Sequence, residues 1–476
     1  MMQKTPATVA TPSAEVEAMQ DDIGLIVDVR AGLKAMRAKA GVYLPRYAAE
    51  DDAEWRRRVA CSPWRGEFSD VLLTLASKPF SRAVGFAEGA PEPILRFADD
   101  VDARGNCLHV FARKLFRDAL ANGVSLILVD YPPNGARTLA DEKRLGLRPY
   151  WSHYPAETII ACRTERIGGR ERIVHLRLRE CVTEPDGQWG ETQIEQVRVL
   201  EPGTWQTWRK EQSPNGVAED WALFEEGTTE PSDDGVKAVP LFLGERMGAI
   251  RARPPLRDLA DMQVELFRAL SRQEEILTYA GSPMLSASGV ERPQDASEMA
   301  VGPKVCLFAP PGPDGRNGSY SYIQPDARNL KEIREHVASI IENMQRLGMA
   351  PTIERDGDVS ATEFAIASAK AHSALQSWAL NLKDALEQAF TFTVPWMNHD
   401  DRRAIGAWPI AVDVHTDFSA DIMAAAEASV ILNAEKERVI SKQTARDELA
   451  RRGMLGPNFD PVEEDRRLAA AERNET

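Results

Sequence analysis

The residues best suited to chemistry lie near the C-terminal end of the sequence. Asp413, His415 and Asp417 alternate along the chain, and His399 stands in the run Asn398-His399-Asp400-Asp401. In a strand, alternate side chains point to the same face, so the first three would lie together. Carboxylate and imidazole groups are suitable ligands for Mn, Fe or Zn. A metal-dependent hydrolase using His399, Asp413, His415 and Asp417 is therefore one hypothesis. The alternative is the polar face of a half-buried strand beside a solvated turn.

Other catalytic signatures do not occur in the sequence. It contains no G-x-x-x-x-G-K-[ST] phosphate loop, no G-x-S-x-G elbow, no H-E-x-x-H and no kinase motif set. The five cysteines are odd in number and scattered, without a C-x-x-C pair, which favours reduced thiols over a disulfide framework or a zinc site. We expect a protein without catalytic chemistry and without an obligatory cofactor.

The composition restricts the possible partners. The formal net charge of the 476-residue chain is −15, whereas a DNA-coating protein needs a basic face that displaces counterions. No window reaches the ~18 apolar residues of a membrane helix, so we expect no membrane partner. The N-terminus has no apolar core typical of a secretory signal. Residues 1–19, rich in Thr, Pro, Ser and Ala, are predicted to form a flexible tail.

The N-terminal half is predicted to change from helical to β structure. Residues 20–145 show helical spacing of apolar side chains, and Gly123 is expected to end the helix that starts at Cys107. A compact strand follows at 124–129. Residues 173–179 alternate between apolar and polar side chains, which predicts a strand, and Asp186-Gly187 is a turn signal.

The central region is predicted to hold two helices around a segment rich in helix breakers. Pro254-Pro255 can start a helix that runs to about Tyr279, and residues 281–325 then contain many Pro and Gly. An irregular segment of that length is either functional or a misassigned element. The second helix ends at Gly348. Its apolar residues step by three and four and form a seam that needs a partner, such as a neighbouring copy: Leu330, Ile333, Val337, Ile340, Met344 and Leu347.

A charged loop and a long helix follow this seam. The run from Ser360 to Glu363 is a capping-box signature, and the helix it opens meets no proline before Pro395. Residues 391–418 return to strand-like alternation. Residues 420–473 are predicted to be helical again.

Basic residues admit two interpretations. Lys331, Arg334 and Arg346 lie on the polar side of the seam helix among glutamates, which is typical of a solvated face with i,i+4 ion pairs. Alternatively, these three residues form a sparse row of basic side chains that makes brief contacts with DNA phosphates without binding them tightly. The run Trp55-Arg56-Arg57-Arg58 favours a helix with one packed aromatic and a solvated basic side over a nucleic-acid patch.

The order of these elements, together with several sequence strings, resembles tailed-phage portal proteins. The resemblance extends to a portal-associated family catalogued as a domain of unknown function, and it covers about residues 40–455. The strings that carry it are residues 43–45 and 54–58, 102–108 with 123–132, 148–151 with 156–160, 254–260, 281–285 and 359–363.

The resemblance implies a mainly helical α+β portal fold in a ring of about twelve subunits at one capsid vertex. Double-stranded DNA would pass through the ring without sequence specificity during packaging and ejection. The implied partners are the terminase large subunit, the head–tail adaptor, and the major capsid and scaffold proteins. The location would be the virion, after assembly in the host cytoplasm. Another minor head or adaptor protein is a further alternative.

The regions of a portal subunit, transferred onto this sequence, give the following expectations. They are a wing at 20–253, stem helices at 254–280 and 326–348, a clip at 281–325, a tunnel loop at 349–360, a long helix at 361–394, a β return of the wing at 395–419 and crown helices at 420–476. The resemblance places Lys331, Arg334 and Arg346 near DNA in the stem. The resemblance also places six residues of the tunnel loop near DNA, namely Thr352, Ile353, Glu354, Arg355, Asp356 and Asp358.

Overall fold

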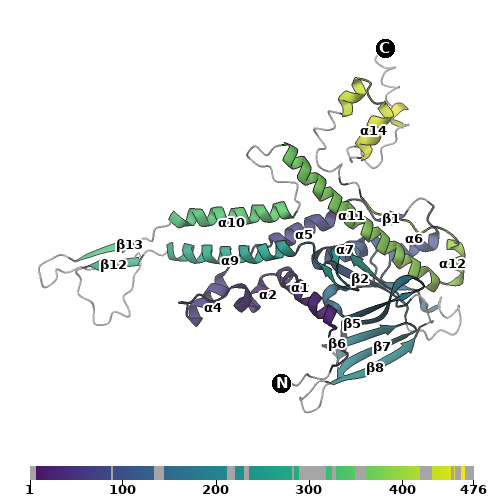
Figure 1. Cartoon of the computed structure of the whole chain (residues 1–476), viewed down its shortest axis with the longest axis horizontal. Coiled ribbons are helices and arrows are strands. Elements are labelled where there is room, and N and C mark those ends of the chain that lie inside the picture. Colours follow the sequence, from purple (N-terminus) through teal and green to yellow (C-terminus); the bar gives the residue numbers. More distant parts are fainter. Residues whose placement is uncertain are drawn as a thin grey trace. The chain divides into compact units, whose positions relative to one another are not determined.

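Contacts within the chain separate two units of mixed helix and sheet (Figure 1). One comprises Met1–Gln20, Leu72–Pro255 and Met349–Thr476, and the other comprises Asp21–Val71 and Leu256–Gly348. The computed structural model describes residues 7–86, 89–132, 144–211, 220–229, 235–280, 284–288, 318–323, 328–348, 361–416, 418, 431–451, 455 and 463–466. Within these ranges no helix is long and apolar enough to cross a bilayer.

The smaller unit is helical apart from one β-hairpin. It contains the second half of α1 (Ala14–Ala31), α2 (Leu33–Ala38), α3 (Ala40–Tyr43), α4 (Asp52–Cys61), the start of α5 (Glu67–Ser77), α9 (Arg257–Ala280), β12 (Met284–Ser288), β13 (Ser319–Ile323) and α10 (Arg328–Leu347). A capping box starts α4, because the side chain of Asp51 accepts the Glu54 N–H at 2.8 Å and the Glu54 carboxylate accepts the Asp51 N–H at 3.2 Å.

A three-stranded antiparallel sheet is the centre of the larger unit. Its strand order is β3 (Tyr150–Pro155), β2 (Val124–Asp130) and β9 (Ala238–Phe242). Every residue of β2 is buried, as expected for an apolar central strand. Helices α7 (Leu108–Asn122) and α11 (Ala361–Thr393) pack on this sheet.

The end of α7 confirms the predicted role of Gly123. This residue has φ +86, in the left-handed region that favours glycine. A Cβ atom at this position would lie 3.1 Å from the carbonyl oxygen of Ala252 and 3.2 Å from Pro254. The helix therefore ends where both the backbone conformation and the close approach of another segment favour glycine.

A five-stranded antiparallel meander forms the second sheet of the larger unit. Its strands are β4 (Ile159–Ile167), β5 (Arg170–Asp186), β6 (Gly190–Glu201), β7 (Thr204–Glu211) and β8 (Asp220–Thr228), paired in chain order. The predicted alternation at 173–179 is confirmed, because Leu176 and Leu178 are buried whereas Arg179 is exposed. The predicted turn at Asp186-Gly187 joins β5 to β6.

Other elements of the larger unit are short. They are η1 (Lys78–Phe80), β1 (Gly85–Phe86), α6 (Glu92–Asp99), η2 (Ala156–Thr158), β10 (Glu245–Arg246), β11 (Ala252–Arg253), η4 (Val394–Trp396), α12 (His399–Ile405), β14 (Val412–Asp413) and α14 (Lys442–Arg451).

The prediction of a flexible tail over residues 1–19 is wrong from residue 14 onward. Helix α1 begins at Ala14, and Val16 and Met19 are fully buried. The carboxylate of Glu15 also accepts the backbone N–H groups of Ile250 at 2.9 Å and Arg251 at 3.0 Å. The apolar spacing of this stretch signals a helix, and its tail-like composition concealed that pattern.

The predicted β return at 395–419 is also largely wrong. This region begins with η4 and α12, and its only described strand, β14, has two residues that pair with β1. Asn398 caps α12, since its side-chain oxygen accepts the Asp401 N–H at 2.9 Å. The alternation from Val412 onward therefore gives only the short strand β14, whereas the residues before it form a capped helix.

An aromatic cluster joins the end of α11 to the central sheet. The ring of Trp151 lies edge-on to Phe97, Phe111 and Phe390, with centroid distances of 5.5, 5.7 and 4.8 Å. The indole N–H of Trp151 donates to the hydroxyl of Thr393 at 2.7 Å, and both residues are fully buried. The polar atom of this buried tryptophan is therefore satisfied by one hydroxyl.

Replacing that hydroxyl should destabilise the larger unit. In Thr393→Val, the buried indole N–H loses its acceptor, at a cost of about 1–3 kcal/mol. Urea unfolding followed by tryptophan fluorescence measures the change. Thr393→Ser keeps the hydroxyl and is the control. Equal stability of the Val variant and the wild type would contradict this role.

Candidate functional site: the paired helices α9 and α10

Helices α9 and α10 run side by side, and the hairpin β12–β13 lies beyond one end of the pair (Figure 1). The hairpin is antiparallel, with Met284 opposite Ile323 and Ser288 opposite Ser319. Since the chain leaves along α9 and returns along α10, the two helices are antiparallel. The predicted helices at 254–280 and 326–348 are confirmed with small changes at their ends.

The predicted seam of α10 is largely buried within a single chain. Val337, Ile340 and Met344 are buried, and α10 packs on α9. At the two ends of the seam, Leu330 is half-buried and Leu347 is 50% exposed. The central residues therefore pack against α9 within the subunit. Contact with a neighbour stays a prediction for the seam ends.

Gly348 ends α10 as predicted, and it lies directly against α5. Its N–H donates to the carbonyl of Met344 at 2.8 Å. A Cβ atom at position 348 would lie 2.3 Å from Cγ1 of Val71. Glycine is therefore required here because another helix leaves no room for a side chain.

Buried polar contacts attach α9 to the N-terminal helices. The side-chain oxygen of Gln263 accepts the Phe68 N–H at 2.9 Å, and its amide donates to the Arg65 carbonyl at 2.7 Å. The hydroxyl of Ser62 donates to that of Ser271 at 2.8 Å. These bonds satisfy backbone groups next to α5 and fix the position of α9 along its axis.

The prediction of a solvated basic side at Arg56-Arg57-Arg58 holds for the first two residues and is wrong for Arg58. Its buried guanidinium donates to both carboxylate oxygens of Glu50, at 2.7 and 2.8 Å, and lies 4.2 Å from the ring centre of Tyr47. The hydrogen bond from Arg58 lowers the pKa of the Glu50 carboxyl below its ordinary value. Trp55 is the packed aromatic of the prediction, and its N–H donates to the carbonyl of Leu44.

The three basic residues predicted for the stem lie on the exposed side of α10. Lys331 is 3.7 Å from Glu335 in an i,i+4 ion pair, and Arg334 and Arg346 are exposed. The pairing of Lys331 agrees with a solvated face of mixed charge. A contact of these residues with DNA stays a prediction. The tunnel-loop residues Thr352, Ile353, Glu354, Arg355, Asp356 and Asp358 lie outside the described residues.

The described residues of the metal hypothesis are not assembled into a site. His399 pairs with its exposed neighbour Asp400 at 3.9 Å, and the ring of His415 packs on Phe418. Asp413 belongs to a strand of two residues, and Asp417 lies outside the described residues. Within the described part of the chain, no three His, Cys, Asp or Glu side chains are grouped so that they could hold a metal.

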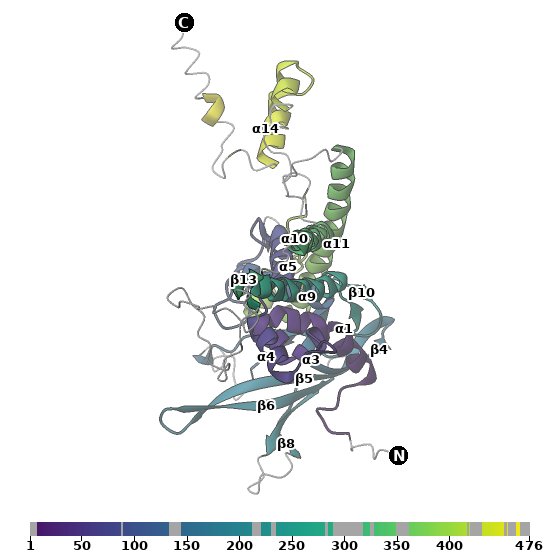
Figure 2. The same ribbon diagram turned by 90° about the vertical axis from the view of Figure 1, so that its left-hand side faces the viewer.

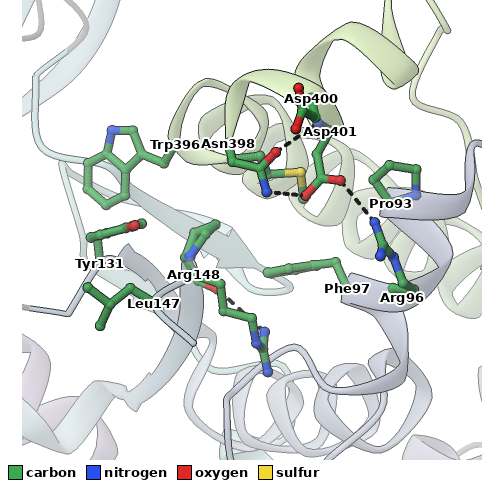
Figure 3. A pocket seen from close by; sticks show the side chains of 12 residues that line it. Pro93, Arg96, Phe97, Tyr131, Leu147, Arg148, Trp396, Asn398, Asp400 and Asp401 are labelled. Carbon is green, nitrogen blue, oxygen red and sulfur yellow. Dashed lines mark hydrogen bonds and ion pairs between the residues drawn. The ribbon is translucent and has the colours of Figure 1, made fainter. Parts of the chain in front are cut away.

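A pocket of about 450 Å³ in the larger unit was not predicted (Figure 3). Three aromatic residues line it, and the ring of Tyr131 lies edge-on to Trp396 at 6.3 Å, with Phe97 on another wall. Its lining comes from α6, the end of β2, the segment before β3, and η4 with α12. Only the fold brings these distant segments together.

The charged groups of this pocket are already paired. Arg96 contacts Asp401 at 2.9 Å, and Arg148 contacts Asp100 at 2.6 Å. Asn398 donates to the carboxylate of Asp401 at 2.8 Å. The pocket therefore combines apolar and aromatic walls with a few polar groups, as small-molecule sites commonly do, and its charges are paired.

Comparisons with known proteins give a family match, a structural match and one negative result. Residues 255–397 match the model of a family described as "Domain of unknown function (DUF4055)". No curated protein matches the chain. One similar solved structure is the "Neck of native GTA particle computed with C12 symmetry". Its TM-score is 0.38 at 10% identity, over 83% of this chain and 93% of that one.

The buried pair of Arg58 and Glu50 should stabilise the smaller unit. Arg58→Ala leaves a buried carboxylate without its partner, and we expect a loss of about 3–5 kcal/mol. Arg57→Ala on the same helix is the exposed control. Because the folded-state pKa of Glu50 is below its ordinary 4.5, the stabilisation is fully present above that value and is lost as the pH falls through the folded pKa. The difference between variant and wild type in urea unfolding should therefore shrink from pH 7 to pH 3.5, and a constant difference would contradict this account.

Gln263 should likewise be required for the attachment of α9. In Gln263→Leu, the Phe68 N–H and the Arg65 carbonyl lose their partner, at about 1–3 kcal/mol for each group left buried. Hydrogen exchange at the Phe68 amide and urea unfolding measure the effect. Gln273→Leu, on the half-exposed part of the same helix, is the matched control. Similar effects of both variants would refute a specific anchoring role.

Proposed function

We propose that this chain is a portal subunit of a tailed-phage-like particle, one of about twelve copies in a ring at a capsid vertex. The observation that carries the proposal is the antiparallel pair α9–α10 with the hairpin β12–β13 beyond its end, followed in the chain by the long helix α11. Such a pair serves as a stem, and its hairpin as an exposed docking element.

Two further observations support the proposal. The family match spans this same succession of elements, from residue 255 to residue 397. The sequence strings that resemble portal proteins extend to both sides of it, over about residues 40–455.

The electrostatics of α10 suit a conduit for double-stranded DNA. Each phosphate that a protein neutralises adds to binding, and 6–10 such contacts make affinity fall roughly 10³–10⁵-fold between 50 and 200 mM salt. The helix has four basic residues against three glutamates, and the chain as a whole has a net charge of −15. A wall of this kind makes few lasting phosphate contacts, so DNA slides along it.

In the proposed assembly, the hairpin end of the stem meets the terminase large subunit during packaging and the head–tail adaptor afterwards. The major capsid and scaffold proteins surround the ring. The chain performs no catalysis and needs no cofactor in this role, since the motor activity belongs to terminase. The exposed end of the seam at Leu347 contacts the neighbouring subunit.

Particle imaging tests the proposal directly. Purified protein should form rings with a central hole, with a mass by mass photometry near twelve times the 52.7 kDa of one chain. Leu347→Asp should reduce ring formation at least tenfold without changing the unfolding of the subunit, because position 347 is half exposed in a single chain. Val439→Asp, at a more exposed position, is the control. A chain that stays monomeric at high concentration, with and without scaffold protein, would overturn the proposal.

A further inference from the structure

The tip of the β5–β6 hairpin exposes a large aromatic side chain. Trp189 is 90% exposed, the highest value among the exposed large apolar residues of the described chain. It precedes Gly190, where a Cβ atom would lie 2.4 Å from the carbonyl oxygen of Asp186, and it follows Gly187 with φ +69. The tight turn that these glycines permit holds the indole at the end of the ribbon.

The outer part of this ribbon is only loosely covered in the described part of the chain, by ion pairs from Arg209 to Glu184 at 2.8 Å and from Lys210 to Glu195 at 2.9 Å. From Cys181 to Glu195 neither strand buries a side chain, and Figure 2 shows the ribbon extending beyond the rest of its sheet. A two-stranded ribbon without a covered face is marginally stable by itself. The exposed tryptophan at its tip is therefore free of the core and accessible to another molecule.

The pocket beside α12 has the size and chemistry to receive an indole. Its volume of about 450 Å³ leaves room for the ring, and Phe97, Tyr131 and Trp396 offer the edge-to-face contacts that aromatic pairs prefer. Its lining contains two arginines and two aspartates, so no net charge attracts an ion. The side chain of Asp400 is among those that line it (Figure 3).

The ribbon cannot bring Trp189 to the pocket of its own subunit. Arg198 on β6 binds Asp130 at 2.6 Å, next to the pocket residue Tyr131. Gly190 is eight residues further along the strand, roughly 26 Å away at the usual rise of a strand. The base of the ribbon is thus held beside the pocket while its tip lies a ribbon length away, so the tip can reach only the pocket of another copy.

We propose that Trp189 of one subunit inserts into the pocket of the adjacent copy. Such a contact joins two different surfaces and is heterologous, so repeating it closes a ring when the rotation between copies fits. The contact itself requires only a second copy of this chain, whereas its closure into a ring rests on the proposed function.

Photo-crosslinking in the full-length protein tests the contact. With p-benzoylphenylalanine in place of Trp189, irradiation should join two chains, and mass spectrometry should find the link in peptides containing Pro93–Phe97, Leu147–Pro149 or Trp396–Asp401. The same replacement at Phe224, an exposed aromatic of β8, is the control. Links from position 189 to other segments only, or none in an oligomeric sample, would overturn the inference.

The energetics of assembly provide a second, independent test. Trp189→Ala and Trp396→Ala should each weaken self-association at least tenfold by analytical ultracentrifugation, with circular dichroism unchanged. The double variant should be no weaker than either single variant, because the two side chains act in one contact. Additive losses would contradict the insertion.

The two proposals fail in different ways. Wild-type rings with unchanged assembly of Trp189→Ala would refute the insertion and leave the portal proposal standing. If position 189 crosslinks to the pocket of another copy but the wild-type protein never closes into rings, the insertion is supported and the portal proposal is refuted.

Discussion

The burial of the α9–α10 seam is the constraint on which the central region depends. Val337, Ile340 and Met344 are covered within the chain, and α9 is itself held by Gln263 and Ser271. Apolar packing supplies most of the stabilisation of such a pair, while the buried hydrogen bonds select one axial position. A helix pair fixed in this way holds the hairpin β12–β13 at a defined distance from its anchors.

Buried polar pairs perform a similar task elsewhere in the chain. Arg58 and Glu50 fix α4 to the loop before it, and Thr393 ties the end of α11 to Trp151. Each pair satisfies groups that would be costly to bury alone. Both units therefore rely on a few specific polar contacts within otherwise apolar cores.

Local patterns predicted much of the fold. The glycines at 123 and 348, the alternation at 173–179 and the two central helices were all readable from the sequence, because caps and periodicity act over a few residues. The helix at 14–19 and the capped helix at 399–405 were missed where composition or a short alternation suggested something else. The sequence also could not show whether the seam faces its own chain or a neighbour, since both cover the same apolar stripe.

The candidate sites likewise divide into those that local sequence patterns determine and those that only the tertiary fold creates. Lys331 was placed correctly on a polar helix face, because helical spacing determines that face. Arg58 binds Glu50 and is not solvated as predicted, because the loop before α4 folds back onto the helix. The spacing of residues along the helix does not encode that path of the loop. The aromatic pocket draws on four segments separated by up to three hundred residues, and no local signal links Phe97 to Trp396.

The contact of Gly348 with Val71 also limits how α10 can evolve. Inserting or deleting one residue within this helix turns everything after it by about 100°, given 3.6 residues per turn. A residue with a side chain would then face the methyl groups of Val71, one of which lies only 2.3 Å from where a Cβ atom at position 348 would stand. Length variation in related chains should therefore be absent from α10 and confined to the segments on either side of it.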